Sequence, residues 1–369
     1  MPLKLVAVIG ARPQFIKAAV VSRQISKYNQ SVSASDLISE FIIHTGQHYD
    51  ANMSDIFFEQ MGIPRPDKYL GIHQLTHGAM TGRMMEEIEK VLLAKKPDWL
   101  LVYGDTNSTL AGALAAVKLH IPVAHVEAGL RSFNREMPEE HNRVLTDHCA
   151  DMLFCPTQTA VDNLKQEGLV EGVHWVGDTM FDAILQFAGI AARRSTILAD
   201  LALQPKEYLL ATVHRPYNTD VPENLRNILS AFVESGERVI FPVHPRTCNR
   251  MKGLDIPGLE RSGVRLIEPV GYLDMLLLEK NARIILTDSG GIQKEAFFFA
   301  VPCLTLRPET EWVETVQAGW NRVVGADKAL ILEGIHSFTE PSEAPPQVFG
   351  SGQSAAQIVA KLVRHHGYL

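Results

Sequence analysis

The sequence has few cysteines, and their spacing suggests no structural role for them. Its 369 residues include four, Cys149, Cys155, Cys248 and Cys303. None belongs to a CxxC pair, so we expect buried free thiols in a reducing, cytoplasmic environment rather than disulfides or a metal centre. His73 and His77 stand four residues apart in "HQLTH", but the glutamate that follows the first histidine of a zinc-protease helix is missing. We therefore expect no metal.

Long hydrophobic runs and an excess of positive charge are also absent. No segment approaches the roughly 20 apolar residues of a membrane span. The opening "MPLKLVAVIG" is typical of a strand and a turn, without the apolar core and cleavage site of a signal peptide. Lys and Arg number 35 against 42 Asp and Glu, a formal net charge of −7. Because polyanion binding needs many basic contacts, we expect neither nucleic acid nor membrane as a partner, and any phosphate site must be local.

The sequence does contain a regular alternation of strand-like and helix-like segments. Runs such as "KLVAVIG" and "WLLVYGD" are continuously apolar, as in parallel strands covered on both faces. After a polar stretch at residues 191–206 the alternation restarts with "EYLLATVH". We predict an α/β fold of two doubly wound Rossmann-like domains, residues 1–172 and 173–350, facing a ligand cleft, with a C-terminal helix at 351–369 that packs on the first domain.

The segment "VIGARPQFIK" predicts one anion site. Gly10 ends a strand, Pro13 suits the first turn of a helix, and helix N-termini attract anions. Arg12 and Lys17 add two cations that together could hold a phosphate. The alternative is two exposed cations near a helix start, although cations there oppose the helix dipole.

The segment "ILTDSGGIQKEA" predicts a second anion site. A strand ends at Asp288, and the backbone N–H groups of Ser289, Gly290 and Gly291 can form an anion-binding nest. Glu295 follows in the helix, and an acidic residue there suits a ribose diol. The alternative is a tight turn with an N-cap serine. One phosphate site in each domain suggests a nucleotide bound between them.

Acids and bases recur at predicted strand ends. Asp105 in "VYGDTNST" and Glu127 in "AHVEAG" each follow a strand, and Glu139 and Arg143 open the helix of "MPEEHNR". His214 in "LLATVHRP" holds the corresponding place in the second domain. Each also has a structural explanation that needs no ligand. Asp105 would be an N-cap, Glu139 and Arg143 would form a surface ion pair, and His214 would be a hydrogen-bonded core histidine. Their recurrence on the ligand side of the sheets favours a shared site.

Eight motifs in order resemble one enzyme family. They are "GARPQFIK", "HTGQH", "GDTNST", "HVEAGLRS", "MPEEHNR", "HRPYN", "TDSGGIQKEA" and "FGSGQSA". Over residues 3–365 the chain resembles the non-hydrolysing UDP-N-acetylglucosamine 2-epimerases. The resemblance implies a GT-B-like pair of Rossmann domains with a UDP-binding second domain, a C-terminal helix that crosses back to the first domain, a homodimer, and no cofactor.

The resemblance also implies roles for the candidate residues. It assigns the UDP diphosphate to Arg12, Lys17, Ser289, Gly290 and Gly291. It implies that Glu295 binds the ribose. The residues that it places around the sugar are Asp105, Glu127, Glu139 and His214, with Arg143 nearby. UDP would leave C1 as a proton leaves C2 and would return with a proton on the other face, so two proton-transfer groups are needed. Which carboxylate removes the proton stays open.

Several residues depart from the family pattern near the sugar. Trp312 stands where many members carry an arginine, and His141 replaces a glycine after the paired glutamates. With these changes the chain resembles the subgroup that acts on UDP-2,3-diacetamido-2,3-dideoxyglucuronate, a surface-polysaccharide precursor. That sugar carries a carboxylate, which a cation such as Arg135 or His141 would bind. Bacterial relatives bind an activating second substrate near Gln47 and His48, and that regulation stays open here. A glycosyltransferase of the same fold and a hydrolysing 2-epimerase are the alternative functions.

Overall fold

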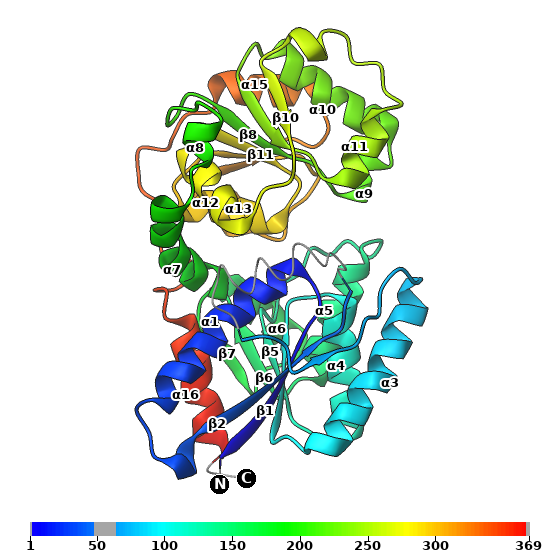
Figure 1. Cartoon of the computed structure of the whole chain (residues 1–369), viewed down its shortest axis with the longest axis vertical. Coiled ribbons are helices and arrows are strands. Elements are labelled where there is room, and N and C mark those ends of the chain that lie inside the picture. The colour runs from blue at the N-terminus through cyan, green and yellow to red at the C-terminus, as the bar shows by residue number, and fades with distance from the viewer. Residues whose placement is uncertain (1, 48–63, 367–369) are drawn as a thin grey trace. The chain divides into compact units, whose positions relative to one another are not determined.

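The computed structural model describes residues 2–47 and 64–366, except the side chains of Arg12 and His366. The chain divides into two compact units, unit 1 (Met1–Leu185 with Gln347–Leu369) and unit 2 (Gln186–Pro346) (Figure 1). Both are parallel sheets flanked by helices, which confirms the predicted α/β class. Unit 1 continues beyond residue 172, because the strand β7 (Val173–Trp175) pairs with β6 (Met152–Cys155) and completes the first sheet.

In the described part of unit 1, seven parallel strands lie in the order β3-β2-β1-β4-β5-β6-β7. Besides β6 and β7, the strands are β1 (Leu3–Ile9), β2 (Ile38–His44), β3 (Lys68–Tyr69), β4 (Trp99–Tyr103) and β5 (Val123–Val126). Every residue of β4 is buried, as expected for a strand covered on both faces. The order changes direction between β1 and β4. In a doubly wound sheet, ligands bind at such a switch point, beyond the carboxyl ends of the strands.

Helices cover both faces of this sheet. They are α1 (Arg12–Asn29), α3 (His77–Lys95), α4 (Asn107–Lys118), α5 (Pro138–Cys149), α6 (Gln158–Gln166), the first part of α7 (Thr179–Arg194), and α16 (Ser354–His366). Helices α3, α4 and α5 pack as neighbours, and α16 lies beside α1 (Figure 1). Val8 of β1, Val102 of β4 and Ile88 of α3 share one buried cluster. The predicted helix within "DANMSDIFFEQM" lies outside the described residues.

The C-terminal motif "FGSGQSA" attaches α16 to unit 1. The Asp182 carboxylate, from α7, accepts hydrogen bonds from the backbone N–H groups of Ser354 at 3.1 Å and Ala355 at 2.8 Å. These groups begin α16, so the carboxylate caps the helix and complements its dipole. Gly350 and Gly352 have positive φ values of 83° and 74°, which favour glycine in the turn that precedes the helix.

Unit 2, which is described throughout, has six parallel strands in the order β10-β9-β8-β11-β12-β13. The strands are β8 (Leu209–Thr212), β9 (Val239–Pro242), β10 (Val264–Ile267), β11 (Ile284–Thr287), β12 (Cys303–Thr305) and β13 (Asn321–Val323). The helices after the end of α7 are α8 (Ile197–Asp200), α9 (Pro216–Thr219), α10 (Pro222–Glu234), α11 (Pro245–Met251), α12 (Tyr272–Asn281), α13 (Gly290–Phe298), α14 (Val313–Gln317) and α15 (Lys328–Ser337). The switch point of this sheet lies between β8 and β11.

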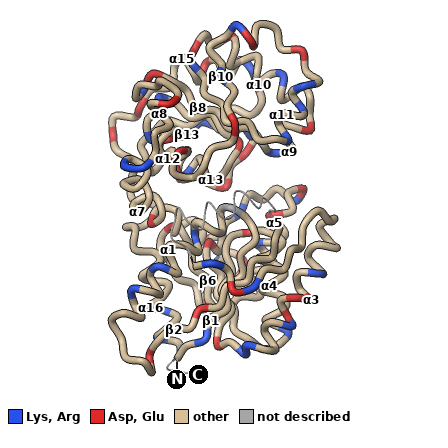
Figure 2. The backbone as a smooth tube through the Cα atoms, in the orientation of Figure 1, with Lys and Arg blue, Asp and Glu red and all other residues tan. Residues whose placement is uncertain are grey.

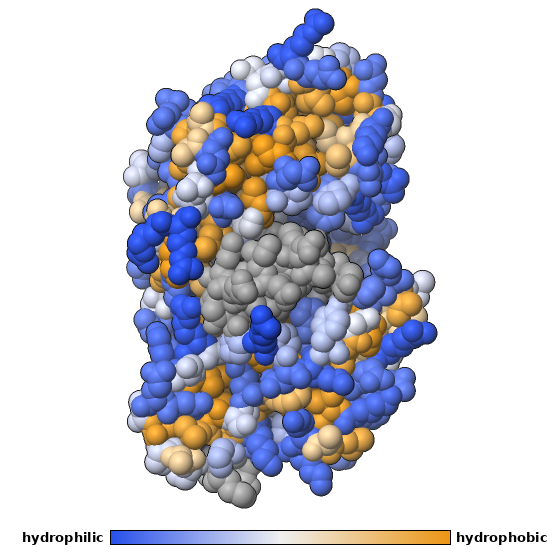
Figure 3. Space-filling model, in the orientation of Figure 1, coloured by the Kyte–Doolittle hydropathy of each residue, from blue (hydrophilic) through white to orange (hydrophobic). Residues whose placement is uncertain are grey.

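Charges of both signs are spread over each unit (Figure 2). On the face drawn in Figure 3, hydrophobic patches are separated by hydrophilic residues. Within residues 2–47 and 64–366, no helix has the length and apolar character that a membrane crossing requires. All four cysteines are free, as predicted; Cys155 and Cys303 are buried, whereas Cys248 is exposed rather than buried as expected.

Candidate active site

The loop after β1 is organised by one buried glutamine. The Gln14 side-chain oxygen accepts hydrogen bonds from the backbone N–H groups of Gly10 at 2.7 Å and Ala11 at 3.0 Å. Its amide nitrogen donates to the backbone oxygen of Tyr103, at the end of β4, at 2.6 Å. Gln14 therefore joins the two loops at the switch point of unit 1. Because Pro13 has no N–H, an anion at this loop would depend on side chains more than on backbone donors.

Lys17 of α1 faces the carboxylate of Glu127, the residue that directly follows strand β5. Its Nζ lies 2.5 Å from Oε2 of Glu127, and the two side chains are only 6% and 10% exposed. This burial excludes the reading of Lys17 as an exposed cation. Glu127 has a φ of 74°, a strained conformation for a residue with a side chain. The side chain of Arg12 lies outside what the structure describes.

Asp105 pairs with a buried arginine. Arg143 NH2 lies 2.5 Å from Oδ2 of Asp105, and its NH1 lies 3.0 Å from Oε2 of Glu140. The Arg143 side chain is 3% exposed, so it is not part of a surface pair. The N-cap of α4 is Thr106, whose side chain accepts a hydrogen bond from the Thr109 N–H, so Asp105 is not the cap.

Two carboxylates thus stand at the ends of adjacent strands. Tyr103 of β4 is opposite Val126 of β5 in the parallel register. Asp105 comes two residues after Tyr103, and Glu127 comes directly after Val126. Each faces a buried cation from a helix. This arrangement supplies two proton-transfer candidates at one edge of the sheet.

The paired glutamates at the start of α5 have different surroundings. Glu140 is buried and accepts hydrogen bonds from the backbone N–H groups of Ser132 and Phe133, both at 2.9 Å, which suits a structural role. Glu139, the residue carried over from the family, is half-buried. Of this pair, Glu139 is therefore the more accessible carboxylate.

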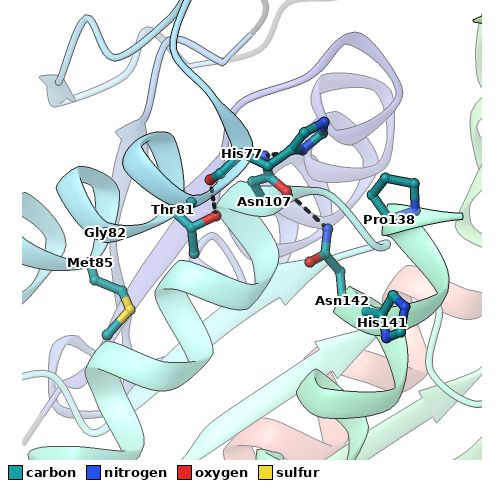
Figure 4. Close-up of a pocket in the computed structure, with 9 residues that line it drawn as sticks. His77, Thr81, Gly82, Met85, Asn107, Pro138, His141 and Asn142 are labelled. Atoms are coloured by element: carbon teal, nitrogen blue, oxygen red, sulfur yellow. Dashed lines mark hydrogen bonds between the residues drawn. The ribbon is translucent and has the colours of Figure 1, made fainter. Parts of the chain in front are cut away.

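A cavity of about 480 Å³ lies beside these residues, lined by the first turns of α3, α4 and α5 (Figure 4). Asn107 stands between His77 and Asn142, with hydrogen bonds of 3.1 Å to each. Asn142 also donates to the backbone oxygen of Asp105 at 3.0 Å, so the wall of the cavity contacts the Asp105 turn. His141 lines the same cavity, and its Nε2 donates to the backbone oxygen of Arg135 at 2.8 Å.

The structure describes Gln47 but not His48, the two residues near which bacterial relatives bind an activator. Gln47 Oε1 accepts hydrogen bonds from Ser108, from its backbone N–H at 3.0 Å and its hydroxyl at 2.7 Å. Gln47 is thus tied to the start of α4. His48 lies outside the described residues.

In unit 2, Asp288 organises the switch point. Its fully buried carboxylate accepts hydrogen bonds from the backbone N–H groups of His214 and Arg215 and, at 3.0 Å, from the side chain of Asn218. His214 Nδ1 also lies 3.2 Å from Asp288 Oδ1, while 42% of the His214 side chain is exposed. This contact orients the ring, so His214 is an accessible imidazole fixed by Asp288 rather than a core histidine.

The turn after Asp288 contains the three residues predicted to form an anion nest, and the Ser289 N–H already donates a hydrogen bond to the Thr287 hydroxyl at 2.9 Å. Ser289 is the N-cap of α13, but its side chain makes no capping hydrogen bond, which argues against the simple N-cap reading. A side chain at Gly290 would collide with the carboxylate of Glu311, whereas one at Gly291 would come no closer than 3.8 Å to another part of the chain. Glu295, one and a half turns into the helix, is buried.

Sequence reasoning missed the residues that hold the site in place. It did not assign Gln14, Asn142 or Asn218 any role, and it treated Asp288 only as the end of a strand. The one local signal was the position of Asp288 directly after an apolar strand. Within the described part of the chain, His, Cys, Asp and Glu side chains form no group of three or more that suits a metal ion.

Two doubly wound units, each with polar residues at its switch point, define the GT-B-like class of two-domain proteins. The sequence profile described as UDP-N-acetylglucosamine 2-epimerase matches residues 30–363. The chain belongs to this family.

Characterised relatives match nearly the whole chain. A UDP-N-acetylglucosamine 2-epimerase homolog of Methanococcus maripaludis is 53% identical, over 98% of this chain and 99% of that protein. The UDP-2,3-diacetamido-2,3-dideoxy-D-glucuronate 2-epimerase of Pseudomonas aeruginosa is 51% identical, over 98% and 100%. The crystal structure of Methanocaldococcus jannaschii UDP-GlcNAc 2-epimerase in complex with UDP-GlcNAc and UDP is 45% identical with a TM-score of 0.89, covering 98% of this chain and all of that one.

Proposed function

We propose that this protein inverts C2 of a UDP-2-acetamido sugar by eliminating and re-adding UDP. The observation that carries the proposal is the pair of carboxylates, Asp105 and Glu127, at the ends of adjacent strands with a buried cation on each. The family membership and the relatives' activities support the same reaction.

The reaction follows from the chemistry of the sugar. The hydrogen at C2 is barely acidic because C1 is an acetal carbon. A carboxylate removes the C2 proton, the electron pair of that C–H bond forms a C1=C2 double bond, and the C1–O bond breaks so that UDP leaves with its electrons. In the return step a UDP oxygen attacks C1, and a proton is delivered to C2 from the opposite face. Two groups are needed, one for each face.

We assign the binding of UDP to residues from both switch points. Ser289, Gly290 and Gly291 begin α13, where backbone N–H groups suit the diphosphate, and Glu295 suits the ribose. In unit 1, Arg12 and Lys17 supply positive charge. The leaving diphosphate gains charge as the C1–O bond breaks, so these donors stabilise the transition state more than the bound substrate.

Two sugars are candidate substrates, UDP-N-acetylglucosamine and UDP-2,3-diacetamido-2,3-dideoxyglucuronate. The relatives include enzymes named for each. His141 at the start of α5 supports the uronate, because it lines the cavity and binds the backbone oxygen of Arg135, whose guanidinium is suited to a sugar carboxylate. We further expect a homodimer that produces a surface-polysaccharide precursor. The four free thiols support a reducing cytoplasm as its location.

The test is side-by-side turnover of the two UDP sugars, with products resolved by mass and chromatography. The proposal predicts that at least one sugar reaches an equilibrium of two C2 epimers, both still attached to UDP. Accumulation of free UDP with the epimerised sugar would show a hydrolysing enzyme instead. Product formation only after addition of an acceptor would show a glycosyltransferase.

A further inference from the structure

A buried histidine joins the two turns that carry the proposed catalytic carboxylates. His125, two residues before Glu127, is fully buried. Its Nε2 lies 2.7 Å from the backbone oxygen of Gly104, the residue before Asp105, and its Nδ1 lies 2.7 Å from Oδ1 of Asp147. Each ring nitrogen of His125 thus lies within hydrogen-bond distance of an oxygen atom, one from each side of the ring.

Asp147 holds the chain on the other side of Glu127. Its second oxygen, Oδ2, accepts hydrogen bonds from the Gly129 N–H at 3.1 Å and from Arg131 at 2.7 Å. Burial alone would raise the pKa of Asp147, but its bonds with His125 and Arg131 outweigh burial and lower the pKa below the usual value. One ionised carboxylate thus fixes a residue before Glu127 and a residue after it.

The backbone of Glu127 needs such support. Its φ of 74° is sparsely populated by residues other than glycine, and such conformations persist only where the surroundings over-determine them. The N–H groups of Glu127 and Ala128 both donate to the backbone oxygen of Phe154 at 3.1 Å. Together with the hydrogen bonds of Asp147 to His125 and Gly129, these bonds fix the backbone on both sides of Glu127.

We propose that His125 and Asp147 are positioning residues that fix Asp105 and Glu127 relative to each other. The inference rests on the proposed function, because it concerns the two carboxylates of that reaction. His125 reaches the Asp105 turn through the Gly104 oxygen and the Glu127 turn through its own strand and Asp147. A displacement of about 1 Å in such groups can reduce turnover about 100-fold.

Two substitutions at His125 separate positioning from stability. In His125→Gln the amide nitrogen takes the place of Nε2, so the bond to Gly104 is kept, and Asp147 loses one partner at Oδ1 while Gly129 and Arg131 still bind Oδ2. In His125→Asn the amide nitrogen takes the place of Nδ1, so Asp147 keeps its partner and the Gly104 oxygen loses its donor. Losing a hydrogen bond to one oxygen of a buried, ionised carboxylate costs more than losing one to a neutral carbonyl oxygen, so the Asn variant should have the higher Tm.

The proposal predicts the opposite order for turnover. We expect kcat of the Asn variant to fall about 100-fold and that of the Gln variant to fall much less, with KM for the UDP sugar close to native in both. Asp151→Ala is the matched control, because Asp151 binds the Val123 N–H at the far end of the same strand. It should lower Tm and leave kcat unchanged. If either His125 variant does not fold, Asp147→Asn, which keeps the side-chain shape, should lower kcat with KM near native.

Other results would overturn the proposal. If kcat follows the order of Tm, or if both variants retain native kcat, His125 is a structural residue only. Turnover by the native protein is measured in the same assay. Native turnover combined with either of those results removes this inference alone, whereas a native protein that epimerises neither sugar removes the proposed function as well.

Discussion

The loop after β1 in unit 1 and the loop after β11 in unit 2 both lie beside a switch point, but they offer an anion different chemistry. In the first loop, Gln14 occupies the N–H groups of Gly10 and Ala11, and the positive charge comes from side chains such as Lys17. In the second, Ser289 begins a helix with two glycines. The first loop provides charge from side chains that pair within the protein. The second provides the first N–H groups of a helix, with open space beside Gly291 but not beside Gly290.

The glycines of the two loops also differ in how much space surrounds them. A side chain at Gly10 would collide with the hydroxyls of Thr45 and Ser108, so Gly10 is required by packing within unit 1. A side chain at Gly291 would meet no other part of the chain within ordinary contact distance apart from Ser289 Oγ at 3.8 Å. Packing therefore does not require glycine at 291, and the proposed diphosphate site offers a reason for it.

The largest expected effect comes from Lys17→Met, which removes the charge of the first loop. We expect kcat to fall about 1000-fold, the upper range for loss of one preorganised electrostatic group. The free energy of unfolding should also fall by about 3 kcal/mol, because the buried Glu127 carboxylate loses the cation of its ion pair. Steady-state kinetics and urea unfolding measure the two effects.

The double variant Lys17→Met/Glu127→Gln separates these effects. It removes both charges of the pair, so it should recover most of the lost stability without recovering turnover. Native turnover in either variant would contradict the role that we assign to this loop.

Unit 1 also contains a carboxyl group whose burial should make stability depend on pH. Burial raises the pKa of Glu40 on β2 from 4.5 to about 7, against an opposing hydrogen bond from Ser22. The folded state then holds a proton that the unfolded state releases, so stability should fall by about 3 kcal/mol as the pH rises from 4.5 to 7. Glu40→Gln should remove this slope. Unfolding curves followed by Trp99 and Trp175, the tryptophans of unit 1, would show it, and an unchanged slope in the variant would exclude Glu40 as the source.

Gly10→Ala tests the packing explanation for the first loop. The added methyl group should displace Thr45 or Ser108 and lower the free energy of unfolding by about 2 kcal/mol. Thermal unfolding measures this effect. A variant as stable as the native protein would show that the loop has more freedom than the contacts indicate.

Gly291→Ala tests the ligand explanation for the second loop and has the smallest expected effect. We expect an unchanged Tm and affinity for UDP about tenfold weaker, a change of about 1.4 kcal/mol, measured by isothermal titration calorimetry. Gly290→Ala is the control, because its collision with Glu311 should lower Tm as well. Native UDP affinity in Gly291→Ala would mean that the turn does not contact the diphosphate.

Features encoded locally were predictable from the sequence, and features that depend on distant partners were not. Apolar strands such as β4 and the polar residues at their ends, including Asp105 and Glu127, could be read from short segments. Gln14 could not, because its acceptor at Tyr103 is 89 residues away. The contact of Asp288 with the His214 backbone spans 74 residues in the same way. Local patterns thus locate the candidate reacting groups, whereas tertiary packing determines which residues hold them in place.

Deuterium incorporation at C2 tests the central claim most directly. The native protein is incubated in deuterated water with each of the two UDP sugars, and substrate and product are analysed by mass spectrometry and NMR. Proton removal and return by side chains that exchange with solvent predict one deuterium at C2 of the epimeric product, with the UDP still attached. Epimer formed with its original C2 hydrogen throughout turnover would contradict the mechanism.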